Sequence, residues 1–336
     1  MGVTGAMRDV LLHLDRWVRD GIRAALASVV QVERSAPRQP GAMLAVSERG
    51  EVIGSVTGGC VEPAVHRQAE EVLAGGAPRL VSYGITDEEG FAVGLSCGGT
   101  VHIFIEPLDP AVIAAVSEAV ATDRPLAVVT AVEGAALGER RLVQPGDVVD
   151  PEAAAMLMCG ETGLVGPEGA RRYVASFVPR PAMYVFGAID HASALARVGR
   201  FLGYRVTVCD AREKFVTPER FPDVDDLVVD WPHRFLAAAP VDERTAICVL
   251  THDVKFDVPV LEVALRTPAA YIGAMGSRRT TEARNARLRA AGVDEDQLAR
   301  IHAPIGLPIG ARTPQEVAVA VAAELVAVTR RAGVFV

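Results

Sequence analysis

The sequence predicts an α/β protein in two parts: an N-terminal mixed α/β domain, then a Rossmann-like domain with a doubly wound parallel sheet. Three observations predict this fold. The chain has 336 residues, too many for one ordinary hydrophobic core. Pro179 and Pro181 interrupt any strand or helix near the middle. After them, short apolar segments alternate with helical ones, which indicates β-α-β units. We therefore place the domains at 1–178 and 179–336.

Composition narrows the class of protein. Half of the residues are hydrophobic and 23% are charged, as in globular proteins. The net charge of −8 argues against nucleic-acid and anionic-membrane partners. No apolar run could span a bilayer, and residues 1–23 carry charges in a helical pattern unlike a signal peptide. Five cysteines without a CxxC motif indicate a reducing compartment. We expect a cytoplasmic protein.

Apolar periodicity and turn residues predict the elements of the first domain. The predicted helices are 6–20, 64–73 and 111–121. The predicted strands are 25–32, 43–46, 52–56, 79–83, 101–106, 126–132 and 172–178. Residues 133–168 are rich in Gly, Glu and Pro and yield no clear element.

The second domain follows a β-α-β rhythm. The predicted strands are 183–186, 205–209, 227–229, 246–250 and 269–272. The predicted helices include 192–202, 278–290 and 314–329, the last opened by a Thr313 cap and a capping-box Glu316. Ligands of such a sheet bind at the carboxyl ends of its strands.

One loop of the first domain has the features of an anion site. Gly58, Gly59 and Cys60 precede Glu62 and Pro63, which open a helix. The unpaired N–H groups of a first helical turn, behind two glycines, favour an anion. The helix dipole also favours a thiolate on the adjacent cysteine.

A second loop repeats this pattern. Cys97 is followed by Gly98 and Gly99, and we expect this loop and the Cys60 loop to form one site. A thiolate there could ligate a soft metal centre or carry a transferable sulfur. An inert thiol or a disulfide are the alternatives, and the spacing does not favour zinc.

Other residues of the first domain and the remaining cysteines are less specific. Arg38, in a turn with two prolines, could reach an anion or be an ordinary surface arginine. Cys159, Cys209 and Cys248 lie on or beside apolar segments, and we interpret them as buried.

The second domain carries half of a dinucleotide fingerprint. Gly187 follows the first strand, but Ile189 stands where a glycine should let the backbone approach a pyrophosphate. Asp210 ends the next strand, where an acid binds ribose, and Arg212 could meet a 2′-phosphate. NAD(P) binding and a Rossmann-like scaffold with another use both remain open.

Two further loops follow strands at the same edge. Their candidate ligand-binding residues are Thr251, His252, Asp253, Gly276, Ser277 and Arg278. The loop at Gly276 offers backbone donors, a hydroxyl and a guanidinium, which suit phosphate; the alternative is a helix cap with a solvated arginine. A structural and a catalytic role are both open for His252.

These motifs together resemble a known family. Segments 55–62, 94–99 and 35–38 are similar to the first domain of the xanthine dehydrogenase accessory (XdhC/CoxI) family, and segments 251–253, 271–273, 276–278 and 304–307 to its Rossmann domain. The resemblance covers nearly the whole chain. The chain departs from it at Ile189, where the family's turn has glycine.

The resemblance implies a maturation chaperone rather than a turnover enzyme. Family members bind molybdenum cofactor (molybdopterin), help it acquire sulfur and hand it to a molybdenum hydroxylase such as xanthine or carbon monoxide dehydrogenase. It implies that Cys60 and Cys97 hold molybdenum or its sulfur, and that adjacent glycine amides hold oxygens. Glu62 is a further candidate cofactor-binding residue of the Cys60 loop. A cysteine desulfurase and a second copy of the chain are the expected further partners. The alternatives are an NAD(P)-dependent oxidoreductase, using Asp210 and Arg212, and an interaction scaffold.

Overall fold

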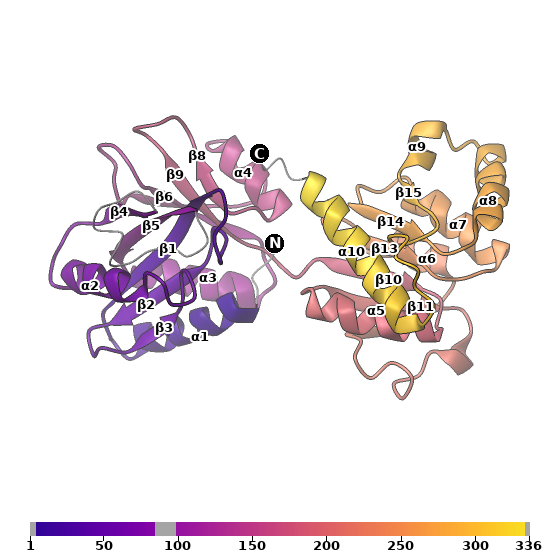
Figure 1. Ribbon diagram of the computed structural model, residues 1–336, viewed down its shortest axis with the longest axis horizontal. Helices are drawn as coiled ribbons and strands as arrows, with labels where there is room; N and C mark the ends of the chain where they lie inside the picture. Colours follow the sequence, from indigo (N-terminus) through magenta and orange to yellow (C-terminus); the bar gives the residue numbers. More distant parts are fainter. Residues whose placement is uncertain (1–4, 85–98, 333–336) are drawn as a thin grey trace. The chain divides into compact units, whose positions relative to one another are not determined.

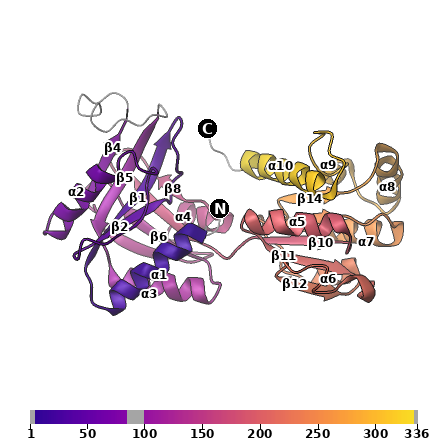
Figure 2. The same ribbon diagram turned by 60° about the horizontal axis from the view of Figure 1, so that its bottom comes forward.

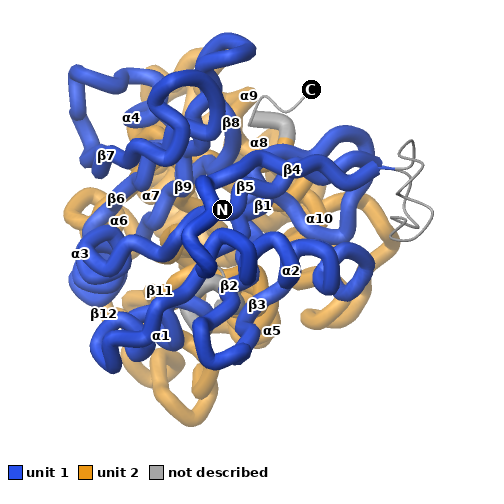
Figure 3. The backbone as a smooth tube through the Cα atoms, turned by 90° about the vertical axis from the view of Figure 1, so that its left-hand side faces the viewer, with its two compact units in different colours: residues 1–179 blue, residues 180–336 orange. Residues whose placement is uncertain are grey.

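The structure, a computed structural model, describes residues 5–84 and 99–332. The chain divides into two compact units, residues 1–179 and 180–336 (Figure 3). Unit 1 combines helices with two antiparallel sheets, and unit 2 has one parallel sheet. The predicted fold class is therefore confirmed. No helix of the described ranges is long and apolar enough to cross a membrane.

Unit 1 contains four helices and nine strands within its described residues. The helices are α1 (Gly5–Arg19), α2 (Glu62–Leu73), α3 (Pro110–Ala121) and α4 (Pro151–Cys159). The strands are β1 (Ala24–Glu33), β2 (Met43–Ser47), β3 (Val52–Gly54), β4 (Arg79–Tyr83), β5 (Thr100–Pro107), β6 (Leu126–Ala131), β7 (Arg140–Val143), β8 (Gly163–Val165) and β9 (Arg172–Phe177).

The strands of unit 1 form two sheets, ordered β3-β2-β1-β5-β4 and β7-β6-β9-β8 (Figure 1). Alternate side chains of β1 and β5 pack under α2, around Val29, Ile103 and Val65. The opposite face of the first sheet packs against α1 and α3, and the same two helices contact β6 and β9 of the second sheet. Both faces of β1 are therefore buried.

Three elements of unit 1, namely β7, α4 and β8, lie in the segment 133–168, for which the sequence yields no prediction. Asp150 caps α4 by accepting from the amide of Ala153, and Gly160 ends it with a φ of 67°. These residues are ordinary start and stop signals. The helix has only nine residues and the strands four and three. Packing on β6 and β9 therefore stabilises them more than local preference does.

Unit 2 alternates strands and helices. Its strands are β10 (Ala182–Phe186), β11 (Arg205–Asp210), β12 (Asp226–Val229), β13 (Ala246–Val249), β14 (Tyr271–Ala274) and β15 (Ile301–His302). Its helices are α5 (Asp190–Phe201), α6 (Pro232–Ala238), α7 (Val254–Ala264), α8 (Arg278–Ala290), α9 (Glu295–Ala299) and α10 (Pro314–Ala332).

The sheet of unit 2 is parallel in the order β12-β11-β10-β13-β14-β15. Met183 and Val185 pack in the core shared with α5 and α10, whereas Tyr184 and Phe186 pack in the core shared with α6, α7 and α8. Figure 2 shows α5 and α6 on opposite sides of the sheet. The chain first adds strands on one side of β10 and then, from β13 onward, on its other side. Sheets of this type bind ligands at the carboxyl ends of the two strands between which the order reverses. The strand β14 begins two residues later than the predicted 269–272.

Candidate functional site

The Cys60 loop leads into α2 as predicted, with its helix beginning at Glu62 and Pro63 in the first turn. Gly58 and Gly59 have φ values of 90° and 127°, which side-chain-bearing residues rarely adopt. The side chain of Cys60 is half-buried against the core under α2. The loop therefore presents a thiol at the start of a helix.

The carboxylate of Glu62 occupies the concave side of this loop. It accepts hydrogen bonds from the hydroxyls of Ser55 (2.6 Å) and Thr57 (2.7 Å). It also accepts from the amides of Val56 (3.2 Å), Thr57 (2.9 Å), Gly58 (2.9 Å) and Gly59 (2.8 Å). Burial alone would raise the pKa of Glu62, but these hydrogen bonds outweigh it and hold the pKa well below its usual range.

This geometry corrects one prediction. The amides of Gly58 and Gly59 were expected to hold oxygens of an anionic ligand, and Glu62 was expected to contact it. Instead, the amides donate to the carboxylate of Glu62, which acts as an internal anion. The loop encloses an anion, but that anion is a side chain of the protein, and its donors are amides of the loop rather than of the first helical turn.

The second predicted loop lies largely outside the described residues, which exclude Cys97 and Gly98. Gly99 is buried, and a Cβ atom there would collide with the carbonyl oxygen of Ser35. The end of this loop therefore abuts the turn that contains Arg38, whose side chain is exposed. Ala36, Cys60 and Tyr83, the last residue of β4, pack around one core cluster.

The remaining cysteines differ from the prediction in one case. Cys209 and Cys248 are buried, and burial raises the pKa of each thiol to about 12. Cys159 is exposed at the end of α4, contrary to the interpretation that it is buried. The nine-residue helix turns its last residues, Met158 and Cys159, outward. No cluster of three metal-ligating His, Cys, Asp or Glu residues occurs within 5–84 and 99–332.

At the first turn of unit 2, the predicted nucleotide-binding groups contact one another. The Asp210 carboxylate accepts from the amide of Ala188 (2.8 Å) and from Arg212 Nε (2.9 Å) and Nη2 (2.7 Å). The Arg212 guanidinium also lies 4.7 Å above the ring of Phe215. Burial alone would raise the pKa of Asp210. The hydrogen bonds from the Arg212 side chain and from the amides of Ala188 and Arg212 outweigh burial, so the pKa lies below its usual value. These contacts use the groups that were predicted to bind ribose and a 2′-phosphate.

The Thr251–Asp253 loop lies at the same edge of the sheet. Thr251 is buried and packs against Gly187, where a Cβ atom would lie 2.9 Å from its Cγ2. His252 is exposed. Asp253 caps α7 by accepting from the Lys255 amide (3.1 Å), and its ion pair with Lys255 lowers its pKa. Asp253 thus has a structural role as a helix cap.

The Gly276 loop leads into α8. Gly276 has a φ of 149°, and Ser277 caps the helix by accepting from the amide of Thr280 (3.2 Å). Arg278 is exposed in the first turn. This placement agrees with both predicted alternatives, a phosphate site and a helix cap.

Two buried charged residues beneath these loops were not predicted, Asp257 on α7 and Arg284 on α8. Asp257 accepts from the hydroxyl of Thr251 and lies 3.9 Å from Arg284 Nη1. Burial raises the pKa of Asp257, although Thr251 and Arg284 oppose the shift. The available signal was their spacing, since each lies one helical turn from a buried neighbour, Leu261 or Leu288.

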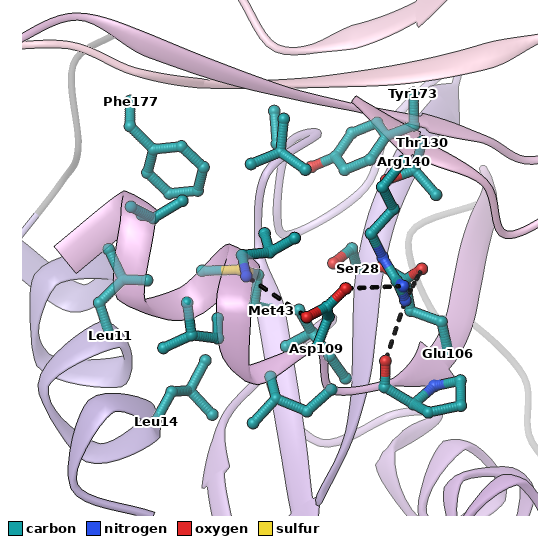
Figure 4. Close-up of a pocket in the computed structure, with 18 residues that line it drawn as sticks. Leu11, Leu14, Ser28, Met43, Glu106, Asp109, Thr130, Arg140, Tyr173 and Phe177 are labelled. Atoms are coloured by element: carbon teal, nitrogen blue, oxygen red, sulfur yellow. Dashed lines mark hydrogen bonds and ion pairs between the residues drawn. The ribbon is translucent and has the colours of Figure 1, made fainter. Parts of the chain in front are cut away.

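A cavity of about 50 Å³ lies inside unit 1, between α1, α3 and both sheets (Figure 4). Leu11, Leu14 and Phe177 line its apolar end. At its polar end, Glu106 accepts from Arg140 Nη2 (2.6 Å). Burial raises the pKa of Glu106 to about 7 although Arg140 opposes the shift. Neither Glu106 nor Arg140 belongs to a motif that would single it out in the sequence.

Comparison with known proteins places the chain among relatives of similar length. Residues 183–325 match the XdhC Rossmann domain, and residues 17–84 match the XdhC and CoxI family. A Bacillus subtilis (strain 168) protein, named as a probable subunit of xanthine dehydrogenase, is 26% identical over 96% of this chain and 98% of its own.

An Escherichia coli (strain K12) protein, the molybdenum cofactor insertion chaperone PaoD, is 28% identical over 97% of this chain and 90% of its own. A crystal structure from Bacillus halodurans, described as a xanthine dehydrogenase, superposes with a TM-score of 0.71 and 23% identity over 96% of each chain. That likeness shows the shared fold. The two domain matches, in the order of the two units, and the full-length relatives establish that the chain belongs to the XdhC and CoxI family.

Proposed function

We propose that this chain binds molybdenum cofactor as cargo and delivers it to a molybdenum hydroxylase of the xanthine dehydrogenase type. The relative named as a molybdenum cofactor insertion chaperone supports the activity, because it aligns with 97% of this chain. The geometric observation that carries the proposal is the Cys60 thiol, held half-buried in a loop that Glu62 fixes by six hydrogen bonds.

The residues of this loop fit a soft metal cargo better than an oxyanion. The amides of Gly58 and Gly59 already donate to Glu62, so the sulfur is the group of the loop that remains for the cargo. Thiolate is a preferred ligand of soft metal centres and a carrier of transferable sulfur. Cys97 is proposed as the second thiol, and Glu62 positions Cys60 without touching the cargo.

The finer parts of the proposal concern sulfur and partners. We propose that the chain also assists sulfuration of the cofactor, with a cysteine desulfurase as the sulfur source. Xanthine or carbon monoxide dehydrogenase is the client, and the chain acts in the cytoplasm as a homodimer. Co-purification with a tagged client and the mass of the purified protein in solution test the partner and the dimer separately.

Cofactor retention tests the central claim. Molybdenum and pterin are quantified in freshly purified wild type and in C60A, C97A and C159A. Cys159 is a matched control because it is an exposed cysteine far along the same unit, on α4. We expect C60A and C97A to retain less than about a tenth of the wild-type cofactor, and C159A to retain all of it. Equal retention in the four proteins would refute the cysteine assignment.

A further inference from the structure

The loop before α8 stands over a buried arginine. Arg284 lies on the inner face of α8 with 3% of its surface exposed. Its Nη1 donates to the carbonyl oxygen of Met275 (2.9 Å). A Cβ atom at Gly276 would lie 3.7 Å from the same nitrogen, so the missing side chain leaves the guanidinium directly beneath the turn.

The charge of Arg284 is incompletely compensated. Its Nε and Nη2 are buried and have no hydrogen-bond partner within the described ranges of the chain. Its ion pair with Asp257 is long, at 3.9 Å, and Asp257 also accepts from Thr251. A buried cation with unpaired donors is costly unless an acceptor completes its contacts. Two donors of the guanidinium are therefore left without an acceptor within the described residues, and Asp257 pairs with it only at long range.

The turn above Arg284 supplies donors that suit such an anion. The helix α8 has 13 residues, and its free first-turn amides carry the positive end of the helix dipole. The hydroxyl of Ser277 lies at this end and is 2.9 Å from the hydroxyl of Thr280. Arg278 adds an exposed guanidinium. Together with Arg284 beneath the turn, these groups are the kinds of donor that the oxygens of a tetrahedral anion require.

We propose that the Gly276–Ser277 turn, the first turn of α8 and Arg284 form a binding site for the phosphoryl group of a small molecule. Arg284 is its buried positive charge and determines its preference for a multiply charged oxyanion over chloride. The site involves neither Cys60 nor Cys97, so its test does not depend on the cargo proposal.

Titration of the full-length protein with inorganic phosphate, at constant ionic strength in chloride, tests the site by calorimetry. R284M removes the buried charge, and R287M removes an exposed charge from the same helix as a matched control. We expect R284M to weaken phosphate binding at least tenfold and R287M to leave it within twofold. Equal binding by both variants, or no binding by the wild type, would overturn the proposal.

Further arms of the same titration identify the source of the phosphoryl group. Tighter binding of AMP than of phosphate, lost in R284M, supports a nucleotide source; equal binding of both, lost in R284M, supports a free anion. AMP binding that R284M leaves intact contradicts the site. Circular dichroism checks that each variant is folded. If R284M does not fold, R284K is used instead; it keeps the charge but not the planar guanidinium, and its phosphate affinity should lie between those expected for wild type and R284M. Unchanged phosphate binding by C60A separates this site from the cargo site.

Discussion

The loop before α2 in unit 1 and the loop before α8 in unit 2 both place glycines at a helix N-terminus. They differ in the charged group that lies against the loop, a carboxylate in the first and a guanidinium in the second. In the first, the carboxylate of Glu62 receives six hydrogen bonds from the residues that precede it. In the second, Arg284 lies buried with two nitrogens unpaired within the described residues. The first loop contains its own anion, and the second lies over a cation whose donors are incompletely paired.

The difference teaches how similar local sequence can have different uses. Where the anion is internal, the backbone is fixed and the exposed chemistry is a neighbouring side chain, here the Cys60 thiol. Where the buried group is a cation, we propose that the loop itself binds an anion. Glycines before a helix can therefore enclose a carboxylate of the protein in unit 1 and, in our proposal, a ligand in unit 2.

Replacement of Glu62 should have the largest effect. E62A leaves four amides and two hydroxyls without their shared acceptor, and we expect the free energy of unfolding to fall by about 4 kcal/mol. Because the folded-state pKa of Glu62 is lowered, its contribution is present above the ordinary value near 4.5 and is lost as the pH falls below it. Denaturant unfolding of wild type and E62A at several pH values measures this.

A second measurement follows Cys60 in the same variant. Alkylation of Cys60 should become several-fold faster in E62A, since the loop is no longer fixed. E62D, which shortens the side chain by one methylene, serves as the control. Its rate of Cys60 alkylation should lie between those of wild type and E62A. Unchanged stability and alkylation in E62A would show that the internal anion does not order the loop.

Replacement of Glu106 should have the opposite pH dependence. Its folded-state pKa is raised from 4.5 to about 7, so its stabilising contribution is complete below pH 4.5 and is lost as the pH rises through 7. The unfolding free energy of E106Q relative to wild type should therefore rise by about 3 kcal/mol between pH 4.5 and 7 and then level off. A constant difference across this range would contradict the raised pKa.

Removal of the whole Arg284–Asp257 pair should cost little stability. R284M combined with D257N removes both buried charges and leaves an acceptor for Thr251, and replacement of a whole buried pair is often neutral, whereas R284M alone leaves the Asp257 carboxylate without its cation. We expect the free energy of unfolding to change by no more than about 1 kcal/mol. Thermal unfolding in the absence of phosphate measures it. A loss as large as that of E62A would mean that the two loops do not differ in the way described.

Replacement of Ile189 should have the smallest effect. I189G restores the glycine of a dinucleotide turn, but Asp210 remains paired with Arg212 and with the amide of Ala188. We therefore expect I189G to bind NADH no better than wild type, with fluorescence titration as the measurement. I189G combined with R212A frees the carboxylate and is the informative second variant. Tight NADH binding by I189G alone would show that the side chain of Ile189, and not the pairing of Asp210 with Arg212, prevents nucleotide binding.

Much of the fold could be predicted because its strands and helices carry regular apolar patterns. The strands β1, β6, β10 and β13 are largely buried, and their apolar runs mark them. The pattern failed for β7, α4 and β8, which are too short to show a period. Their positions depend on contacts with β6 and β9, which a single sequence does not display.

The site was predicted in part. The glycines and the helix start identified the Cys60 loop, since their φ requirements and capping are local properties. The acceptor for its amides was not predicted, because Glu62 reaches back only once the loop has curled around it. Arg284 was missed because α8 carries several arginines, and the spacing of one helical turn between Arg284 and Leu288 is a weak signal beside them.

Gly187 has a consequence for how such sequences are interpreted. Its φ is 110°, and a Cβ atom there would lie 2.9 Å and 3.2 Å from Thr251 Cγ2 and N. The loops after β10 and β13 approach each other so closely that this packing, without any ligand, requires glycine at position 187. Such a glycine carries no information about a nucleotide, since it would persist after the ligand had been lost. The more informative position of the turn is the one at Ile189, because a phosphate approaching the backbone there would exclude a side chain.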